Sequence, residues 1–252
     1  MTMLPSSYDL KEYYNTPQGR GVANMLLRRF GLWWPDDVLK GDIMIGSGYA
    51  PPYLDTCHGP KALYAVLSGQ MGGVAWPSGG PGRCVLADRG VWPLPGSSVD
   101  YILMIHELEY AEDPTQVLDE AWRVLKPEGR LMLVVPNRTG LWARAEKTPF
   151  GHGRPFTSTQ LHNLLRDQNF ALERMTGALL APPTRSITFT QNISPVIEKC
   201  APIASALCGV IVAEATKRLY SPIRGKARPV AKPAMAWGQT APVANPRGKV
   251  VQ

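Results

Sequence analysis

The amino-acid sequence predicts an α/β fold in which a mostly parallel sheet is covered by helices on both faces. The prediction starts from residues 83–137, where two apolar runs at 84–87 and 99–105 have the length of buried strands. An amphipathic helical pattern at 113–125 follows, and a third apolar run occupies 131–135. A strand, a helix of this length and a further strand form a right-handed crossover, which joins parallel strands.

The helix of this crossover has sequence signals at both ends. Asp113 stands where an N-cap is expected, Pro114 suits the first helical position, and Gln116 completes the spacing of a capping box. The segment from Lys126 to Gly129 should end the helix, with the Lys126 ammonium near the carbonyl-rich terminus.

Further elements are expected on both sides of this core. In chain order they are a helix within residues 8–31 that ends at Gly31, a strand at 41–45, a strand at 62–67, a helix that begins with the capping box Thr157–Gln160, and strands at 170–177 and 207–214. Residues 139–156 are too long for a simple turn, and connections of this length are often lids or binding segments. We therefore expect a lid at about 138–156.

The distribution of charge argues against a nucleic-acid-binding core. The formal net charge is +7, but residues 221–252 carry six Lys and Arg residues and no acidic residue, which leaves +1 for residues 1–220. The tail is rich in Pro and basic residues and poor in large apolar ones, so we expect it to be disordered. A solvated tail accounts for it better than a site for nucleic acid or an anionic membrane.

Other sequence features favour a soluble cytoplasmic protein without a bound metal. The four cysteines show no CxxC spacing, so neither a zinc site nor a redox motif is indicated, and we expect reduced thiols. The first residues lack the pattern of a signal peptide. The most apolar later stretch, 201–213, is shorter than the roughly 20 residues needed to cross a bilayer. The sequence leaves the oligomeric state open.

Two positions next to predicted strands are candidates for ligand contact. Gly46 and Gly48 directly follow the strand at 41–45, where glycines let the backbone approach a ligand closely. A nicotinamide-binding turn would have a third glycine where this chain has Pro51. Asp88 follows the strand at 84–87, at the edge where ligands bind in open α/β sheets.

Three motifs together resemble those of class I S-adenosylmethionine-dependent methyltransferases, nearest to the small-molecule branch that includes ubiquinone and menaquinone biosynthesis enzymes. They are GSGYA at 46–50, Asp88 followed by WPLP at 92–95 and SVD at 98–100, and EAWRVLKPEGR at 120–130 before VVPN at 134–137. The resemblance covers roughly residues 8–215, so residues 1–220 are expected to form the methyltransferase domain. It implies a Rossmann-like sheet of seven strands, mostly parallel with the last strand antiparallel.

The resemblance also implies the cofactor S-adenosylmethionine and its contacts, without a metal. The glycine segment would pack against the methionine part, the acidic residue after the third strand would lie by the adenine, and the end of the fourth strand would face the sulfonium and the acceptor. The expected cofactor-binding residues are Gly46, Ser47, Gly48, Tyr49, Asp88, Arg89, Ile105 and His106.

Candidate catalytic and substrate residues lie after the fourth strand and in the lid. His106 is the best candidate base, since its ordinary pKa of about 6.5 suits proton transfer, although a structural role is equally open. His152 either assists catalysis and touches the acceptor or fixes the lid, and Arg154 and Phe156 are the other expected substrate contacts. The acidic run from Glu107 to Asp113 is expected to be a solvated face and a helix start.

Two departures from the family pattern leave alternatives open. An acidic residue usually stands two places before the first glycine, where this chain has Met44, and another usually follows the second strand to hold the ribose hydroxyls, where this chain has Ser68, Gly69 and Gln70. A divergent methyltransferase of a small-molecule acceptor is the interpretation we favour. A non-catalytic scaffold or partner-binding protein is the alternative, and a nucleic-acid methyltransferase comes third.

Overall fold

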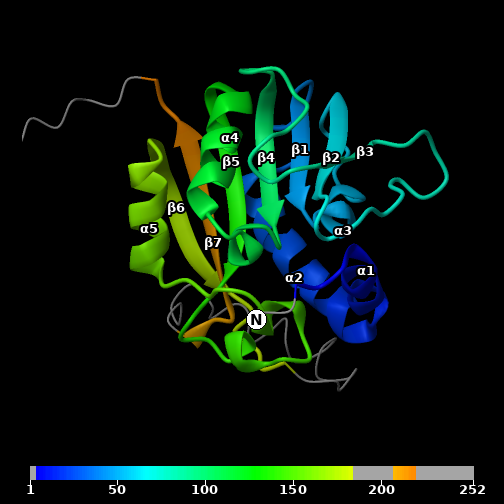
Figure 1. The fold of residues 1–252 in the computed structure, drawn as a ribbon, viewed down its shortest axis with the longest axis vertical. Helices are drawn as coiled ribbons and strands as arrows, with labels where there is room; N and C mark the ends of the chain where they lie inside the picture. Colours follow the sequence, from blue (N-terminus) through cyan, green and yellow to red (C-terminus); the bar gives the residue numbers. More distant parts are fainter. Residues whose placement is uncertain (1–3, 184–206, 220–252) are drawn as a thin grey trace, which may run out of the picture. The chain divides into compact units, whose positions relative to one another are not determined.

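A single seven-stranded sheet forms the centre of the computed structural model, which describes residues 4–183 and 207–219 (Figure 1). The strand order is β3-β2-β1-β4-β5-β7-β6, and only β7 runs antiparallel to its neighbours. The predicted fold class is therefore confirmed. The predicted basic tail at 221–252 and the Pro-rich connection before β7, with Cys200, lie outside the described residues.

The strands and helices have the following bounds. The strands are β1 Ile43–Gly48, β2 Ala62–Ser68, β3 Cys84–Ala87, β4 Val99–Ile105, β5 Leu125–Pro136, β6 Phe170–Ala178 and β7 Val210–Lys217. The helices are α1 Ser7–Asn15, α2 Pro17–Trp33, α3 Pro51–Leu54, α4 Pro114–Val124 and α5 Ser158–Asp167. Three short 3₁₀ helices lie in loops: η1 Leu108–Tyr110, η2 Trp142–Arg144 and η3 Pro149–Gly151.

Each face of the sheet has its own apolar core. Residues of α2 such as Phe30 pack with Met44 of β1, whereas Leu118 of α4 and Leu161 of α5 pack with Ile45 on the other face. Successive strand residues point to opposite faces, so one strand contributes to both cores. Helices on both faces, as predicted, leave the strand ends as the place where polar groups can gather (Figure 1).

The helix expected within residues 8–31 is confirmed by α2, but its predicted end at Gly31 is wrong. The chain forms two helices, because the Thr16 hydroxyl accepts a hydrogen bond from the Gly19 backbone N–H and so begins α2 as an N-cap. The second helix also continues past Gly31 to Trp33. Gly31 is exposed, and its backbone does not adopt the positive φ that a glycine cap requires.

The predicted end of the crossover helix also needs correction. Helix α4 begins after Asp113 as predicted, but it ends at Val124 and β5 starts at once at Leu125. The Lys126 ammonium binds the Asp100 carboxylate at 2.8 Å rather than the helix carbonyls. Lys217 of β7 takes that role, since its Nζ donates to the carbonyl oxygens of Trp122 at 2.7 Å and Leu125 at 2.6 Å.

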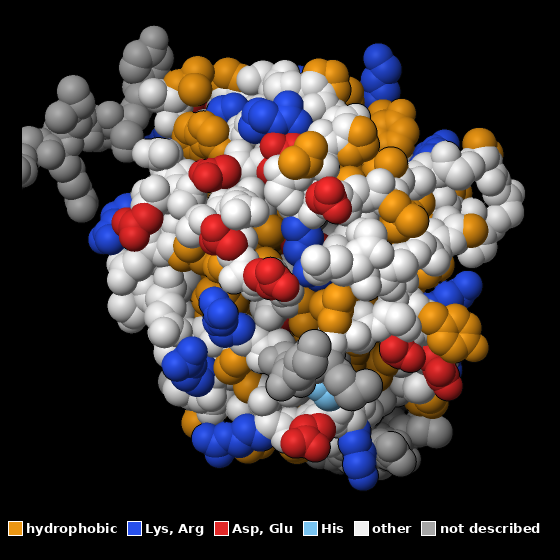
Figure 2. Space-filling view, viewed as in Figure 1, with side chains coloured by type: hydrophobic (Ala, Val, Ile, Leu, Met, Phe, Trp, Pro, Cys, Tyr) orange, Lys and Arg blue, Asp and Glu red, His pale blue; other side chains and the backbone are white. Residues whose placement is uncertain are grey.

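The expectation that β3 is buried is wrong. Leu86 is 53% exposed and Val85 is 37% exposed, because β3 is the edge strand of the sheet. On the face shown in Figure 2, Lys and Arg side chains are interspersed with Asp and Glu side chains. That mixture agrees with the near-neutral charge of residues 1–220.

Lys217→Met should lower the free energy of unfolding by about 1–3 kcal/mol, because two carbonyl groups at the end of α4 would lose their donor. Denaturant unfolding monitored by circular dichroism measures the change. Arg218→Met is the matched control, since Arg218 is exposed and pairs with Glu173 at the surface. Equal stability of the two variants would contradict this role for Lys217.

Candidate functional site

The predicted glycine segment lies inside β1 and not in a loop after it. Gly48 pairs with Ile105 of β4 and has a φ of +76°, and a Cβ atom there would lie 2.2 Å from the Ile105 carbonyl oxygen. At Gly46 a Cβ atom would lie 2.5 Å from that of Ala50. Both glycines are therefore required for the close approach of β1 to β4 and α3. Ser47 between them is buried.

A buried chain of hydrogen bonds starts at His106, directly after β4. Its Nδ1 lies 3.1 Å from Glu109 Oε1, and its Nε2 lies 2.8 Å from the Tyr14 hydroxyl, which in turn lies 2.8 Å from the Tyr53 hydroxyl. Tyr14 also stacks on Tyr49, with ring centroids 5.9 Å apart. The structure thus brings the predicted residues Tyr49 and His106 together through a side chain of α1 that the sequence did not single out.

The polarity of this chain follows from the groups in it. A carboxylate only accepts, so the His106 proton sits on Nδ1 facing Glu109, and Nε2 accepts from Tyr14. Burial raises the pKa of the Tyr14 and Tyr53 hydroxyls well above their ordinary value, which keeps both of them as donors. Both ring nitrogens of His106 therefore have a buried partner, Glu109 at Nδ1 and Tyr14 at Nε2.

A second polar cluster centres on Arg89, directly after Asp88. Its Nε donates to Glu107 Oε1 at 3.0 Å, and its Nη1 donates to Gln70 Oε1 at 2.7 Å and to the Tyr110 carbonyl oxygen at 3.1 Å. Gln70 follows β2, Arg89 follows β3 and Glu107 follows β4. One guanidinium therefore connects the ends of three strands.

The expected solvated acidic face is wrong for half of its members. Glu107 and Glu109 are each only 2% exposed, whereas Glu112 and Asp113 are exposed. The chain turns inward at η1, and the lid closes over it, with the Arg154 backbone N–H donating to the Glu109 carbonyl oxygen at 2.7 Å. The available signal was position, because both carboxylates lie within four residues of the end of β4, a buried parallel strand.

Several buried polar atoms at this edge of the sheet have no hydrogen-bond partner among the described residues. They are Ser68 Oγ, Arg89 Nη2, Glu107 Oε2 and Glu109 Oε2. The hydroxyl of Tyr13, the residue before Tyr14 in α1, is also buried and unpaired. Buried polar groups in folded proteins are normally paired, because an unpaired one costs about 1–3 kcal/mol. Such a group of unpaired atoms indicates a place for a polar ligand.

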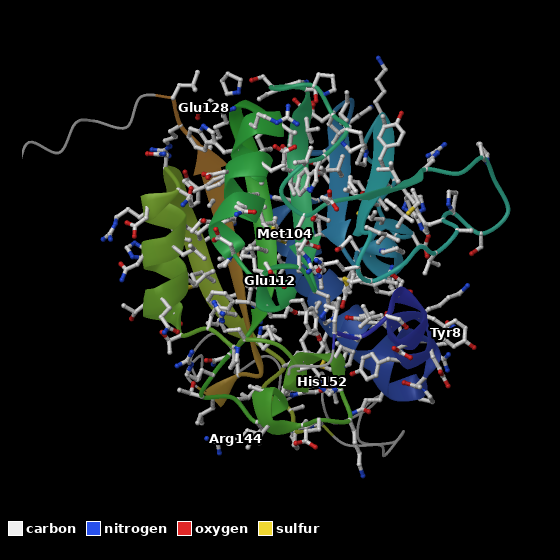
Figure 3. All side chains as sticks on the ribbon, viewed as in Figure 1. Tyr8, Met104, Glu112, Glu128, Arg144 and His152 are labelled. Carbon is white, nitrogen blue, oxygen red and sulfur yellow. The ribbon has the colours of Figure 1, made fainter. Side chains whose placement is uncertain are left out.

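A cavity of about 580 Å³ opens beside Glu109, one of these residues. Its walls include Gln70, Glu109, Tyr110, Glu112 and Arg154. In Figure 3, the labelled residues Glu112 and His152 lie beyond the end of β4, on the same side of the sheet as Tyr8 of α1. Residues that follow β2, β4 and β5 therefore line one cavity.

The remaining predicted residues occupy different environments. Asp88 is exposed at the carboxyl end of β3, and the Ile105 carbonyl oxygen accepts a hydrogen bond from the Tyr49 backbone N–H at 2.7 Å. His152 is half-buried in the lid. The Phe156 side chain packs in the apolar core with Leu161 of α5, rather than lining the cavity.

Within residues 4–183 and 207–219, no group of three or more His, Cys, Asp and Glu side chains is arranged to hold a metal ion. Cys57 and Cys84 are free thiols. Within the same ranges, every helix is too short or too polar to cross a lipid bilayer.

Comparison with known proteins gives a family model and several solved structures. Residues 64–174 match the sequence model of a methyltransferase domain. A structure described as a SAM-dependent methyltransferase from Aquifex aeolicus superimposes with a TM-score of 0.57 at 18% identity, over 84% of this chain and 98% of that one. The fold is that of a class I S-adenosylmethionine-dependent methyltransferase. A second methyltransferase structure, from Mesorhizobium loti, gives a TM-score of 0.54 at 15% identity, over 80% and 98% of the chains.

The curated relatives carry the same family name. A protein from Mycobacterium tuberculosis, described as a probable S-adenosylmethionine-dependent methyltransferase, is 32% identical over 97 residues, which are 38% of this chain and 35% of the relative. A protein of the same description from Mycolicibacterium smegmatis is 32% identical over 87 residues, or 34% of each chain. The chain thus spans about a third of the length of these relatives. Together the comparisons imply S-adenosylmethionine as the cofactor.

Stability should depend on pH through Glu107. Burial raises the pKa of this carboxyl from 4.5 to about 7, against the opposing effect of Arg89. Between these values the folded protein holds a proton that the unfolded chain has released, so the contribution of Glu107 to stability falls as the pH rises through that window. Above pH 7 its ionised form costs about 2–3 kcal/mol.

Glu107→Gln should remove this dependence. The free energy of unfolding of variant and wild type is measured in denaturant at pH 5 and at pH 8. Relative to wild type, the variant should be about 2–3 kcal/mol more stable at pH 8 than it is at pH 5. Comparing the two proteins cancels the titration of the other carboxyls. A difference that stays constant from pH 5 to pH 8 would contradict the raised pKa.

Proposed function

We propose that the protein transfers the methyl group of S-adenosylmethionine to a small organic acceptor and releases S-adenosylhomocysteine. The observation that carries the proposal is the group of unpaired buried polar atoms at the carboxyl ends of β2, β3 and β4, one of whose residues, Glu109, lines an open cavity. Ligands bind at this edge in open α/β sheets. The near-neutral charge of residues 1–220 supports a small molecule over a nucleic acid as acceptor.

The residues around this edge fit the cofactor. Because Gly46 and Gly48 have no side chain, the backbone of β1 lies close to the end of β4. Arg89 supplies one unpaired donor and Glu107 one unpaired acceptor. The residues proposed to hold the cofactor are Gly46, Ser47, Gly48, Tyr49, Asp88, Arg89, Ile105 and His106. When bound, the cofactor supplies a methyl group already activated by its sulfonium.

The task of the chain is therefore mainly to position the acceptor and exclude water. Aligning the acceptor atom with the methyl carbon converts an encounter in solution into a reaction within one complex. We assign the acceptor to the cavity under the lid, where Arg154 forms part of the wall and His152 lies nearby.

His106 is the proposed base for an acceptor that carries a proton at neutral pH. Glu109 holds its Nδ1–H, so Nε2 can take a proton, as in other His–carboxylate pairs. The Tyr14 hydroxyl lies 2.8 Å from this Nε2, so it would have to give way to an acceptor that His106 deprotonates directly. His152 in the lid is the second candidate.

Isothermal titration calorimetry with S-adenosylhomocysteine tests the proposal. We expect binding at one site per chain, and Asp88→Asn should weaken it about tenfold, or 1.4 kcal/mol, because the neutral amide oxygen is a weaker acceptor for the adenine amino group than the carboxylate is. Asp119→Asn, an equally exposed substitution on α4, should bind as wild type does. If neither S-adenosylhomocysteine nor S-adenosylmethionine binds at millimolar concentration, the assignment fails and the non-catalytic scaffold replaces it.

A further inference from the structure

The end of β2 lacks the carboxylate that the family resemblance leads one to expect there. Ser68, Gly69 and Gln70 occupy the positions at and after its last residue. Ser68 is only 4% exposed, and its hydroxyl has no hydrogen-bond partner in the part of the chain that the structure describes. The place is therefore polar and buried, but it provides no negative charge of its own.

Glu107 is a buried carboxylate with one oxygen left unpaired. Arg89 Nε donates to Oε1 at 3.0 Å, while Oε2 has no partner among the described residues. The side chain is 2% exposed, so water does not readily substitute for the missing donor. An acceptor in this state suits a ligand that brings a hydroxyl or amino donor.

The ion pair between Arg89 and Glu107 joins the ends of two strands, β3 and β4, that are not neighbours in the sheet. Strands β2 and β1 lie between β3 and β4, so the ion pair of Arg89 with Glu107 passes across the carboxyl ends of the two intervening strands. The hydrogen bond from Arg89 Nη1 to Gln70 fixes the guanidinium against the loop after β2. Arg89 thereby holds the Glu107 carboxylate over the central strands.

We propose that Glu107, positioned by Arg89, and Ser68 bind the two ribose hydroxyls of the cofactor in place of the carboxylate that the chain lacks after β2. Each hydroxyl of a vicinal diol donates one hydrogen bond and accepts others. Glu107 Oε2 and Ser68 Oγ accept from the diol, and Arg89 Nη2 donates to it. The three unpaired buried atoms are then satisfied at once. This inference rests on the proposed function.

Glu109 provides an internal control for this assignment. It is as buried as Glu107 and also has an unpaired Oε2, but its other oxygen binds His106 and it lines the cavity with Arg154. A neutral substitution at Glu109 therefore removes the same charge from the same edge of the sheet. It should change the affinity for ligands with and without the diol by the same factor.

Calorimetry with two ligands at pH 8, where Glu107 is mostly ionised, tests the inference on the full chain. The ligands are S-adenosylhomocysteine and its 2′,3′-dideoxy analogue, which lacks both hydroxyls. Wild type should bind the first about 100-fold more tightly, since hydrogen bonds to a charged group are the stronger ones. Glu107→Gln should narrow this ratio to about tenfold or less, Ser68→Ala should narrow it severalfold, and Glu109→Gln should leave it at the wild-type value.

The outcomes separate this inference from the proposed function. Ser68→Ala guards against a folding defect, because it removes an unpaired buried hydroxyl and should not lower the thermal midpoint. Suppose that wild type binds S-adenosylhomocysteine. The diol assignment is overturned if Glu107→Gln and Ser68→Ala keep the wild-type ratio of the two affinities, or if Glu109→Gln narrows that ratio as much as Glu107→Gln does. The proposed function stands in both cases. If wild type does not bind S-adenosylhomocysteine at all, both are overturned.

Discussion

The burial of a half-paired carboxylate after β4 is the constraint on which the site depends. Glu107 has one oxygen bound by Arg89 and one without a partner, and burial raises its pKa to about 7. Such an arrangement lowers stability at neutral pH, and the rest of the fold must offset it. Proteins commonly retain an unfavourable group of this kind where a ligand completes it.

Glu214, another buried carboxylate, has hydrogen-bond partners for both of its oxygens. Glu214 of β7 is 1% exposed, and its oxygens accept from the Trp34 indole N–H at 2.8 Å, from Arg130 at 3.3 Å and from Arg174. Every side of that carboxylate is occupied by protein groups, which fits a role in holding β5, β6 and β7 together with α2. Glu107 differs because its second oxygen is unpaired and lies at the edge where ligands bind.

The crossover from β4 to β5 could be predicted from the sequence because its signals are local. Neighbours within a few residues determine the N-cap at Asp113 and the 3.6-residue period of α4. The same holds for the capping box at Thr157, which begins α5 after β5. The resemblance also led to Arg89 and His106. For the burial of Glu107 and Glu109 the only signal was their position after β4, since the burial itself depends on the turn at η1 and on the segment that follows β5. The contact of Tyr14 with His106 joins residues 92 positions apart, so no local pattern announces it.

The central claim is that the cofactor lies across the ends of β2, β1 and β4 with its ribose against Glu107. The most direct measurement is a crystal structure of the protein in complex with S-adenosylhomocysteine. The account predicts the ribose hydroxyls within hydrogen-bonding distance of Glu107 Oε2 and Ser68 Oγ, with Arg89 still bound to Glu107. A complex in which the ribose lies away from both residues, or in which Glu107 Oε2 remains unpaired, would contradict it.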